Sequence, residues 1–233
     1  LAAGASGFEA DLQRRLALAL CAYHERNFAR VRELAIETLQ RFPGGDGIED
    51  FHWLLGLVSR GEDRLESYGR ALEKVPRFPL ALLCRGSEYA ARGEHRKATA
   101  DYDLLLELQP GMAWARISRG IARKKLNDPR GAIEDYDVAL SIEPSASVFY
   151  HRANARKMLG DTAGAIGDYD AALELDPRHA ESLVNRGNAR RVLGDLAGAI
   201  ADYARALDVA EPGWSYRADV SARLAEMREQ QGR

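Results

Sequence analysis

Residues 178–212 read RHAESLVNRGNARRVLGDLAGAIADYARALDVAEP, and this stretch decides the fold. It predicts one helix over residues 182–193, a break at Gly194-Asp195 and a second helix over residues 196–209. A glycine readily takes the positive φ that ends a helix, and an aspartate directly after it is a favoured N-cap. A proline at the end of the stretch prevents the second helix from continuing. The stretch is therefore expected to form a helical hairpin.

The same pattern returns along most of the chain at intervals of 33 or 34 residues. Prolines that end helical segments are Pro43, Pro76, Pro110, Pro144 and Pro177. Tyrosines at the same interval are Tyr68, Tyr102, Tyr136, Tyr169 and Tyr203. Small residues repeat as Gly86, Gly120, Ala153 and Gly187, and as Ala98, Ala132, Ala165 and Ala199. Agreement of several residue types on one period predicts an array of helix pairs.

Asn127-Asp128 and Gly160-Asp161 break two earlier repeats in the same place, and Pro129 suits a first helical turn. This pattern resembles the tetratricopeptide repeat, a helix–turn–helix unit of 34 residues, over nearly the whole chain. With the proline as position 32, the family's small residues fall at positions 8 and 20 and its aromatic residue at position 24. The resemblance implies an all-α fold, a right-handed α-solenoid of about six such repeats with a C-terminal capping helix.

The expected boundaries describe one continuous solenoid domain. They are a trimmed end or linker over 1–7, a degenerate repeat over 8–43, an irregular repeat over 44–76, four regular repeats over 77–110, 111–144, 145–177 and 178–212, and a capping helix over 213–233. The irregular repeat has His52 at position 8 and Arg64 at position 20, which predicts a helix of altered length or tilt. The cap is expected to bury one apolar stripe, formed by Tyr216, Val220, Leu224 and Met227.

Composition excludes several classes of protein. The 233 residues are 46% hydrophobic and carry a net charge of −2, so neither a disordered tail nor a general attraction to nucleic acid is expected. No apolar run is long enough to predict a membrane span. Cys21 and Cys84 lack metal-ligand spacing and are expected to be small buried apolar residues. With no basic lead-in of a signal peptide, a reducing, cytoplasmic setting is expected.

In the family that the sequence resembles, the first helix of each repeat builds the inner, concave wall. The resemblance therefore assigns positions 2, 5, 6, 9, 12 and 13 to a groove. The candidate partner-binding residues are Trp114, Ile117, Ile121, Lys124, Tyr150, His151, Asn154, Lys157, Asn185, Asn188 and Arg191. An aromatic and apolar floor with amides and cations suits an extended peptide, whose backbone and carboxylates these groups can bind.

Family members that grip the C-terminal carboxylate of chaperones use Lys and Asn at fixed groove positions. Asn154 and Asn185 match that pattern, but Tyr150 stands where a lysine is expected and the capping segment offers no matching cation. A different groove ligand is therefore favoured. The alternative is that these polar side chains only solvate the inner wall.

Arginines occupy positions 7 and 11 in three repeats, and aspartates occupy position 23. The arginines are Arg119, Arg123, Arg152, Arg156, Arg186 and Arg190. Two arginines one helical turn apart repel each other unless acids lie nearby. The repetition favours a structural Arg–Asp ladder between helices, and the alternative is a basic strip for an acidic or phosphorylated partner.

The sequence favours a scaffold that binds a protein or peptide partner. It contains no P-loop, nucleophile elbow or metal-ligand cluster, so neither catalysis by this chain nor a cofactor is expected. The alternative is a regulatory or oligomerisation segment of a larger enzyme or signalling protein, and self-association through the terminal repeats is a further option. RNA binding is disfavoured, because RNA-reading helical repeats lack this framework and the charge is near neutral.

Overall fold

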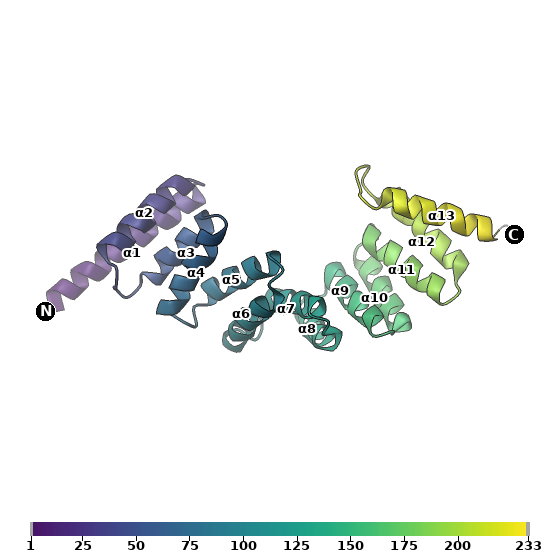
Figure 1. Ribbon diagram of the computed structural model, residues 1–233, viewed down its shortest axis with the longest axis horizontal. Helices are drawn as coiled ribbons and strands as arrows, with labels where there is room; N and C mark the ends of the chain where they lie inside the picture. Colours follow the sequence, from purple (N-terminus) through teal and green to yellow (C-terminus); the bar gives the residue numbers. More distant parts are fainter. Residues whose placement is uncertain (1, 232–233) are drawn as a thin grey trace. The chain divides into compact units, whose positions relative to one another are not determined.

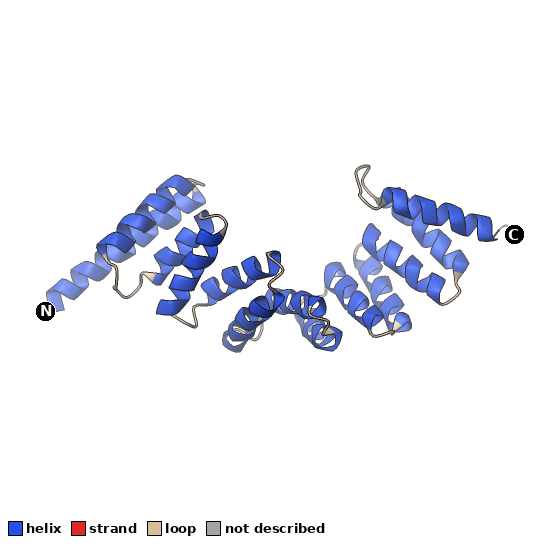
Figure 2. Cartoon of the chain, viewed as in Figure 1, coloured by secondary structure: helices blue, strands red, loops and turns tan. Residues whose placement is uncertain are grey.

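A computed structural model describes residues 2–231 of the chain. Over this range it contains thirteen α-helices and no strand (Figure 2). The expected all-α solenoid of helix pairs is confirmed, because consecutive helices pack against each other as hairpins within each part of the chain.

The chain divides into two compact units, one ending at Pro110 and one beginning at Gly111. The N-terminal unit contains α1 (Ala2–His24), α2 (Phe28–Arg41), α3 (Glu49–Val58), α4 (Glu62–Lys74), α5 (Pro79–Ala91) and α6 (His95–Leu108) (Figure 1). The C-terminal unit contains α7 (Ala113–Lys125), α8 (Pro129–Ile142), α9 (Ala146–Met158), α10 (Thr162–Leu175), α11 (Ala180–Val192), α12 (Leu196–Val209) and α13 (Arg217–Gln231). Helix α1 includes residues 2–7 of the expected lead-in, and Leu1 lies outside the described residues.

The breaks inside the repeats have the predicted chemistry. Asn127, Gly160 and Gly194 have φ values of 62°, 81° and 83°. The aspartate after each break caps the next helix, and in the last repeat the Asp195 side chain accepts a hydrogen bond from the backbone N–H of Gly198 at 2.8 Å. A Cβ at Gly198 would collide with the Asp195 carboxylate, which explains the glycine there.

A small residue packed on a tyrosine ring forms the centre of each regular repeat. A Cβ on Gly120 would lie 2.6 Å from the Tyr136 ring, and one on Gly187 would lie 2.9 Å from the Tyr203 ring. Both tyrosines are fully buried. The small residue at position 8 therefore lets the two helices of a hairpin approach closely enough to enclose the ring.

The irregular repeat over 44–76 corrects one expectation. Gly56, and not His52, lies against the Tyr68 ring, so the glycine and the tyrosine are 12 residues apart instead of 16. Helix α3 is correspondingly short, with 10 residues, whereas α5 has 13. The repeat has thus lost about one helical turn between these two residues.

Two further expectations differ from the structure at single residues. Cys84 is half-buried, but Cys21 is exposed on α1 and does not belong to the core. In the cap, Val220, Leu224 and Met227 are buried against Ala199 and Tyr203 of α12. Tyr216 precedes α13 and is 57% exposed, because the helix begins only at Arg217.

Candidate functional site

The arginines at positions 7 and 11 form the predicted ladder. In the last repeat, the Arg186 guanidinium donates to the Asp202 carboxylate through Nε at 3.0 Å, and Arg190 donates to the same carboxylate at 2.8 Å. Asp202 is buried. The same bonds join Arg152 and Arg156 to the buried Asp168.

The ladder also joins neighbouring repeats. Arg152 donates to Asp137 of the preceding repeat at 2.6 Å, and Arg186 donates to Asp170 at 2.6 Å. Burial lowers the pKa of Arg186, but the hydrogen bonds to Asp202 and Asp170 outweigh it, so its pKa is raised overall. These arginines are structural, and the alternative of a basic strip at positions 7 and 11 is not supported.

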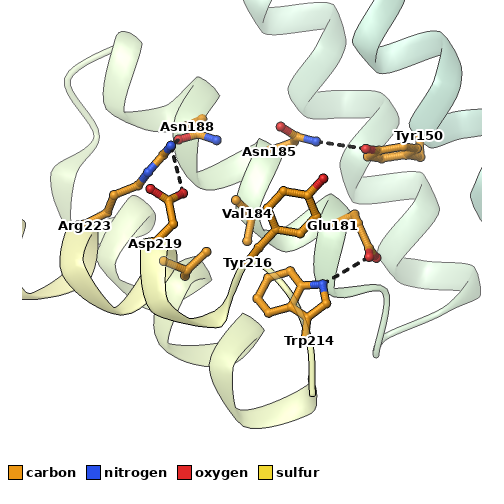
Figure 3. Close-up of a pocket in the computed structure, with 10 residues that line it drawn as sticks. Tyr150, Glu181, Val184, Asn185, Asn188, Trp214, Tyr216, Asp219 and Arg223 are labelled. Atoms are coloured by element: carbon orange, nitrogen blue, oxygen red, sulfur yellow. Dashed lines mark hydrogen bonds and ion pairs between the residues drawn. The ribbon is translucent and has the colours of Figure 1, made fainter. Parts of the chain in front are cut away.

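The predicted groove residues belong to α7, α9 and α11, the first helices of their repeats. Their helical spacing assigns them to one side of each helix, which we call the helix-A face. At the end of this face, an open cavity of about 270 Å³ lies between α9, α11, α13 and the segment before α13 (Figure 3). It is lined by Tyr150, Glu181, Val184, Asn185, Asn188, Trp214, Tyr216, Asp219, Val220 and Arg223. Three of the predicted residues, Tyr150, Asn185 and Asn188, are thereby brought together.

Half of the lining comes from the C-terminal segment, which sequence analysis did not assign to the site. The Trp214 indole N–H donates to the Glu181 carboxylate at 3.3 Å. Arg223 donates to Asn188 Oδ1 at 3.0 Å and pairs with Asp219 at 2.9 Å (Figure 3). The capping segment therefore does supply a cation to the helix-A face. Two aromatic residues just before the cap were the available signal, but their placement depends on how α13 docks.

The asparagines on this face are partly occupied by internal hydrogen bonds. The Tyr169 hydroxyl donates to Asn154 Oδ1 at 2.7 Å, and the Tyr203 hydroxyl donates to Asn188 Oδ1 at 2.7 Å. Asn185 donates from Nδ2 to the Tyr150 hydroxyl at 3.3 Å. Asn154 and Asn188 therefore help to fix their own hairpins, and Asn185 links two neighbouring repeats.

An aromatic cluster extends from the cavity toward α7. The Tyr150 ring lies 5.2 Å from the His179 ring and 5.5 Å from the His151 ring, and His151 stacks on Tyr136 at 6.0 Å. Burial lowers the pKa of His151 to about 4, and nearby Lys124 and His179 contribute to the shift. His151 is thus a neutral, packed ring at pH 7.

The apolar residues predicted on α7 divide between core and surface. Ile117 and Ile121 are partly buried against the cluster that contains Tyr136 and Val148. Trp114 is 50% exposed at the beginning of α7. The two isoleucines therefore stabilise the repeat, and Trp114 offers accessible aromatic surface.

Three predicted cations occupy position 12 of successive repeats: Lys124, Lys157 and Arg191. Lys157 and Arg191 line a second cavity of about 440 Å³ together with Asn188 and Arg223. Burial lowers the pKa of Lys157, and burial together with Lys125 lowers that of Lys124.

Neither a metal-binding cluster nor a membrane-spanning helix occurs among the described residues. No set of three or more His, Cys, Asp or Glu side chains within residues 2–231 is arranged to hold a metal ion. Over the same range, no helix combines the length and apolar character needed to span a bilayer.

Comparisons with known proteins agree with this fold. Residues 150–215 match the family model described as tetratricopeptide repeat. No curated protein sequence gives a match. YrrB, described as a TPR protein with an unusual peptide-binding site, superposes with a TM-score of 0.68 at 18% identity, over 81% of this chain and 97% of that one.

Two further solved structures have the same fold. TTC0263 from Thermus thermophilus, described as a thermophilic TPR protein, has a TM-score of 0.57 and 22% identity, over 77% of this chain and 98% of that one. MamA from Desulfovibrio magneticus RS-1 has a TM-score of 0.62 and 18% identity, over 76% and 94% of the respective chains.

The stacked hairpins and their shared architecture define a helical-repeat protein. Because the period, the Gly–Tyr packing and the solved neighbours agree, the chain has the fold of tetratricopeptide-repeat proteins, and residues 150–215 match that family.

Proposed function

We propose that this chain is a protein-interaction scaffold that binds an extended peptide segment of a partner on the helix-A face of its C-terminal unit. The observation that carries the proposal is the 270 Å³ cavity between α9, α11 and α13. Its walls combine accessible aromatic surface from Trp214 and Tyr216 with amide and carboxylate groups from α11. Apolar surface with a few convergent polar groups is typical of binding sites.

The proposal assigns no catalysis to the chain. The buried carboxylates Asp135, Asp168 and Asp202 are held by arginines of the ladder, and such paired carboxylates are suited to structure. The peptide-binding site described for YrrB supports a binding role for this fold.

The test is selection of peptides from a displayed library of random 12-residue sequences, followed by affinity measurements with the full chain. Tyr216→Ala removes an accessible aromatic side chain from the cavity, so we expect a selected peptide to bind it about tenfold more weakly. Leu175→Ala is the matched control, because Leu175 on α10 is 53% exposed and Tyr216 is 57% exposed.

Equal binding by wild type and Tyr216→Ala would move the interaction away from this cavity. If no peptide is selected, a role as a regulatory or oligomerisation segment becomes the better account. Light scattering over a range of concentrations would then test self-association directly.

A further inference from the structure

We propose that Lys124, Lys157 and Arg191, which we call the cation row, bind carboxylate side chains of an acidic segment in the partner. This inference rests on the proposed function and specifies the chemistry of its ligand. The row is distinct from the ladder arginines, which occupy other positions of the same three helices.

The cation row and the ladder arginines differ in their ion pairs. Arg152, Arg156, Arg186 and Arg190 all donate to buried aspartates. Among the described residues, by contrast, no carboxylate lies within ion-pair distance of any member of the row. A fold that pairs the ladder cations so regularly has left this row available to a ligand.

The two lysines of the row are partly removed from water. Lys124 and Lys157 are only partly exposed, and burial lowers the pKa of each amine. A partly desolvated ammonium group gains more from a carboxylate than a fully hydrated one does, because the surrounding dielectric is lower. Charge complementarity therefore favours a carboxylate ligand.

The cation row lies beside the proposed peptide site. The row has one cation in each of three successive repeats, at spacings of 33 and 34 residues. Lys157 and Arg191 border the 440 Å³ cavity, which shares Asn188 and Arg223 with the 270 Å³ cavity of the proposed peptide site. A peptide seated in one cavity can thus place acidic side chains in the other.

The spacing suggests a ligand pattern. Helices α7 and α9 contact each other, and the axes of packed helices lie about 8–10 Å apart. An extended peptide advances about 3.3 Å per residue, so it covers this distance in about three residues. Acidic side chains about three residues apart should therefore match Lys124 on α7 and Lys157 on α9.

The experiment uses fluorescein-labelled peptides of 12 residues with Glu at every third position, and counterparts with Gln at those positions. Binding to the full chain is followed by fluorescence anisotropy at low salt. We expect the Glu peptide to bind at least tenfold more tightly than the Gln peptide. Added NaCl should reduce that difference, because salt screens charge pairs that remain partly exposed.

Two triple variants each remove three positive charges, the first variant from the cation row and the second from other exposed positions. Lys124→Gln, Lys157→Gln and Arg191→Gln together should weaken binding of the Glu peptide at least tenfold. Arg96→Gln, Arg130→Gln and Arg228→Gln remove three exposed cations from α6, α8 and α13 and should weaken it less than twofold. Lys124→Arg with Lys157→Arg keeps the charges and should retain binding.

Folding does not obscure the result. Lys124 and Lys157 are partly buried and Arg191 is exposed, so removing these three charges should leave the thermal midpoint by circular dichroism unchanged or higher. The comparison of Glu and Gln peptides on the wild-type chain tests the same proposal without any variant.

Several outcomes would overturn the inference. One is equal binding of the two peptides, and another is an equal effect of the two triple variants. A third is that a single-stranded 12-nucleotide RNA binds more tightly than the Glu peptide and that this binding is lost in the Lys124, Lys157 and Arg191 triple variant. That result would assign the row to nucleic acid. If library-selected peptides still depend on Tyr216 in these cases, the proposed function stands and only the acidic chemistry fails.

Discussion

At the scale of single residues, the tyrosine hydroxyls show how the helix-A face is linked to the interior. Tyr169 and Tyr203 each donate to an asparagine at position 9 of the same repeat. In the repeat of Tyr136, position 9 is Ile121, and the buried Tyr136 hydroxyl has no partner within the described residues. The tyrosine hydroxyl at this position of the repeat therefore has a hydrogen-bond acceptor in two repeats and, within the described residues, none in a third.

This difference predicts opposite responses to removal of the hydroxyl. Tyr169→Phe should lower the free energy of unfolding by about 1 kcal/mol, because it breaks a hydrogen bond to Asn154. Tyr136→Phe should be neutral or slightly stabilising, because it removes a buried polar atom without a partner. Urea unfolding of the two variants checks this, and equal losses would contradict it.

His151 predicts a pH-dependent stability. Its pKa is lowered from 6.5 to about 4 by burial against Tyr136 and Tyr150, with Lys124 and His179 nearby. Between these pH values the unfolded chain binds a proton that the folded chain does not, so stability falls as pH falls from 6.5 to 4. The loss from this residue is at most about 3 kcal/mol.

The variant His151→Phe keeps a ring on Tyr136 and cannot be protonated. Its urea midpoint relative to wild type should therefore rise steadily as the pH is lowered from 7 to 4. A difference that stays constant over this range would show that the His151 ring is already accessible to protons in the folded state.

At the scale of helices, the Arg–Asp ladder predicts different costs for two aspartates that bind the same arginine. The Asp202 side chain is 3% exposed and accepts from both Arg186 and Arg190. The Asp170 side chain is 45% exposed and belongs to the preceding repeat. Asp202→Ala should cost about 2–4 kcal/mol, because it leaves two partly buried guanidinium groups without their acceptor.

Asp170→Ala should cost less than about 1 kcal/mol, as expected for a partly exposed ion pair. Denaturant unfolding of both variants at one ionic strength gives the comparison. Similar costs would mean that the ladder stabilises contacts between repeats as strongly as contacts inside them.

The helices themselves were largely predictable from the sequence. The helices expected over 182–193 and 196–209 are Ala180–Val192 and Leu196–Val209, because break, cap and proline are local signals. The Gly56–Tyr68 contact was missed, since counting back from Pro76 could not detect a turn lost inside the repeat. The contribution of Trp214 and Arg223 was missed because it depends on long-range docking of α13.

At the scale of the whole chain, the two compact units predict that a destabilising substitution lowers the stability of its own unit more than that of the other. In repeat proteins each repeat contacts only its neighbours, so stability is a sum of local terms. Trp53 lies in the N-terminal unit and Trp214 in the C-terminal unit. Variants that keep one of these tryptophans, with the others changed to Phe, report on each unit separately.

Asp202→Ala should lower the urea midpoint of unfolding in both reporter variants. We expect the midpoint followed by Trp214 fluorescence to fall by more than the midpoint followed by Trp53 fluorescence. The same pair of reporters in the otherwise unchanged chain provides the baseline. An identical shift at both positions would indicate that the chain unfolds as one cooperative structure.

The ion pairs between repeats also bear on how such a chain can change its length during evolution. Arg152 binds Asp137 and Arg186 binds Asp170, with the same 2.6 Å distance at both junctions. An in-frame duplication of residues 145–177 would bring its own arginine for the repeat before it and its own aspartate for the repeat after it. Each new junction would then be chemically identical to the old ones, so the array could lengthen in one genetic event without first evolving a new complementary surface.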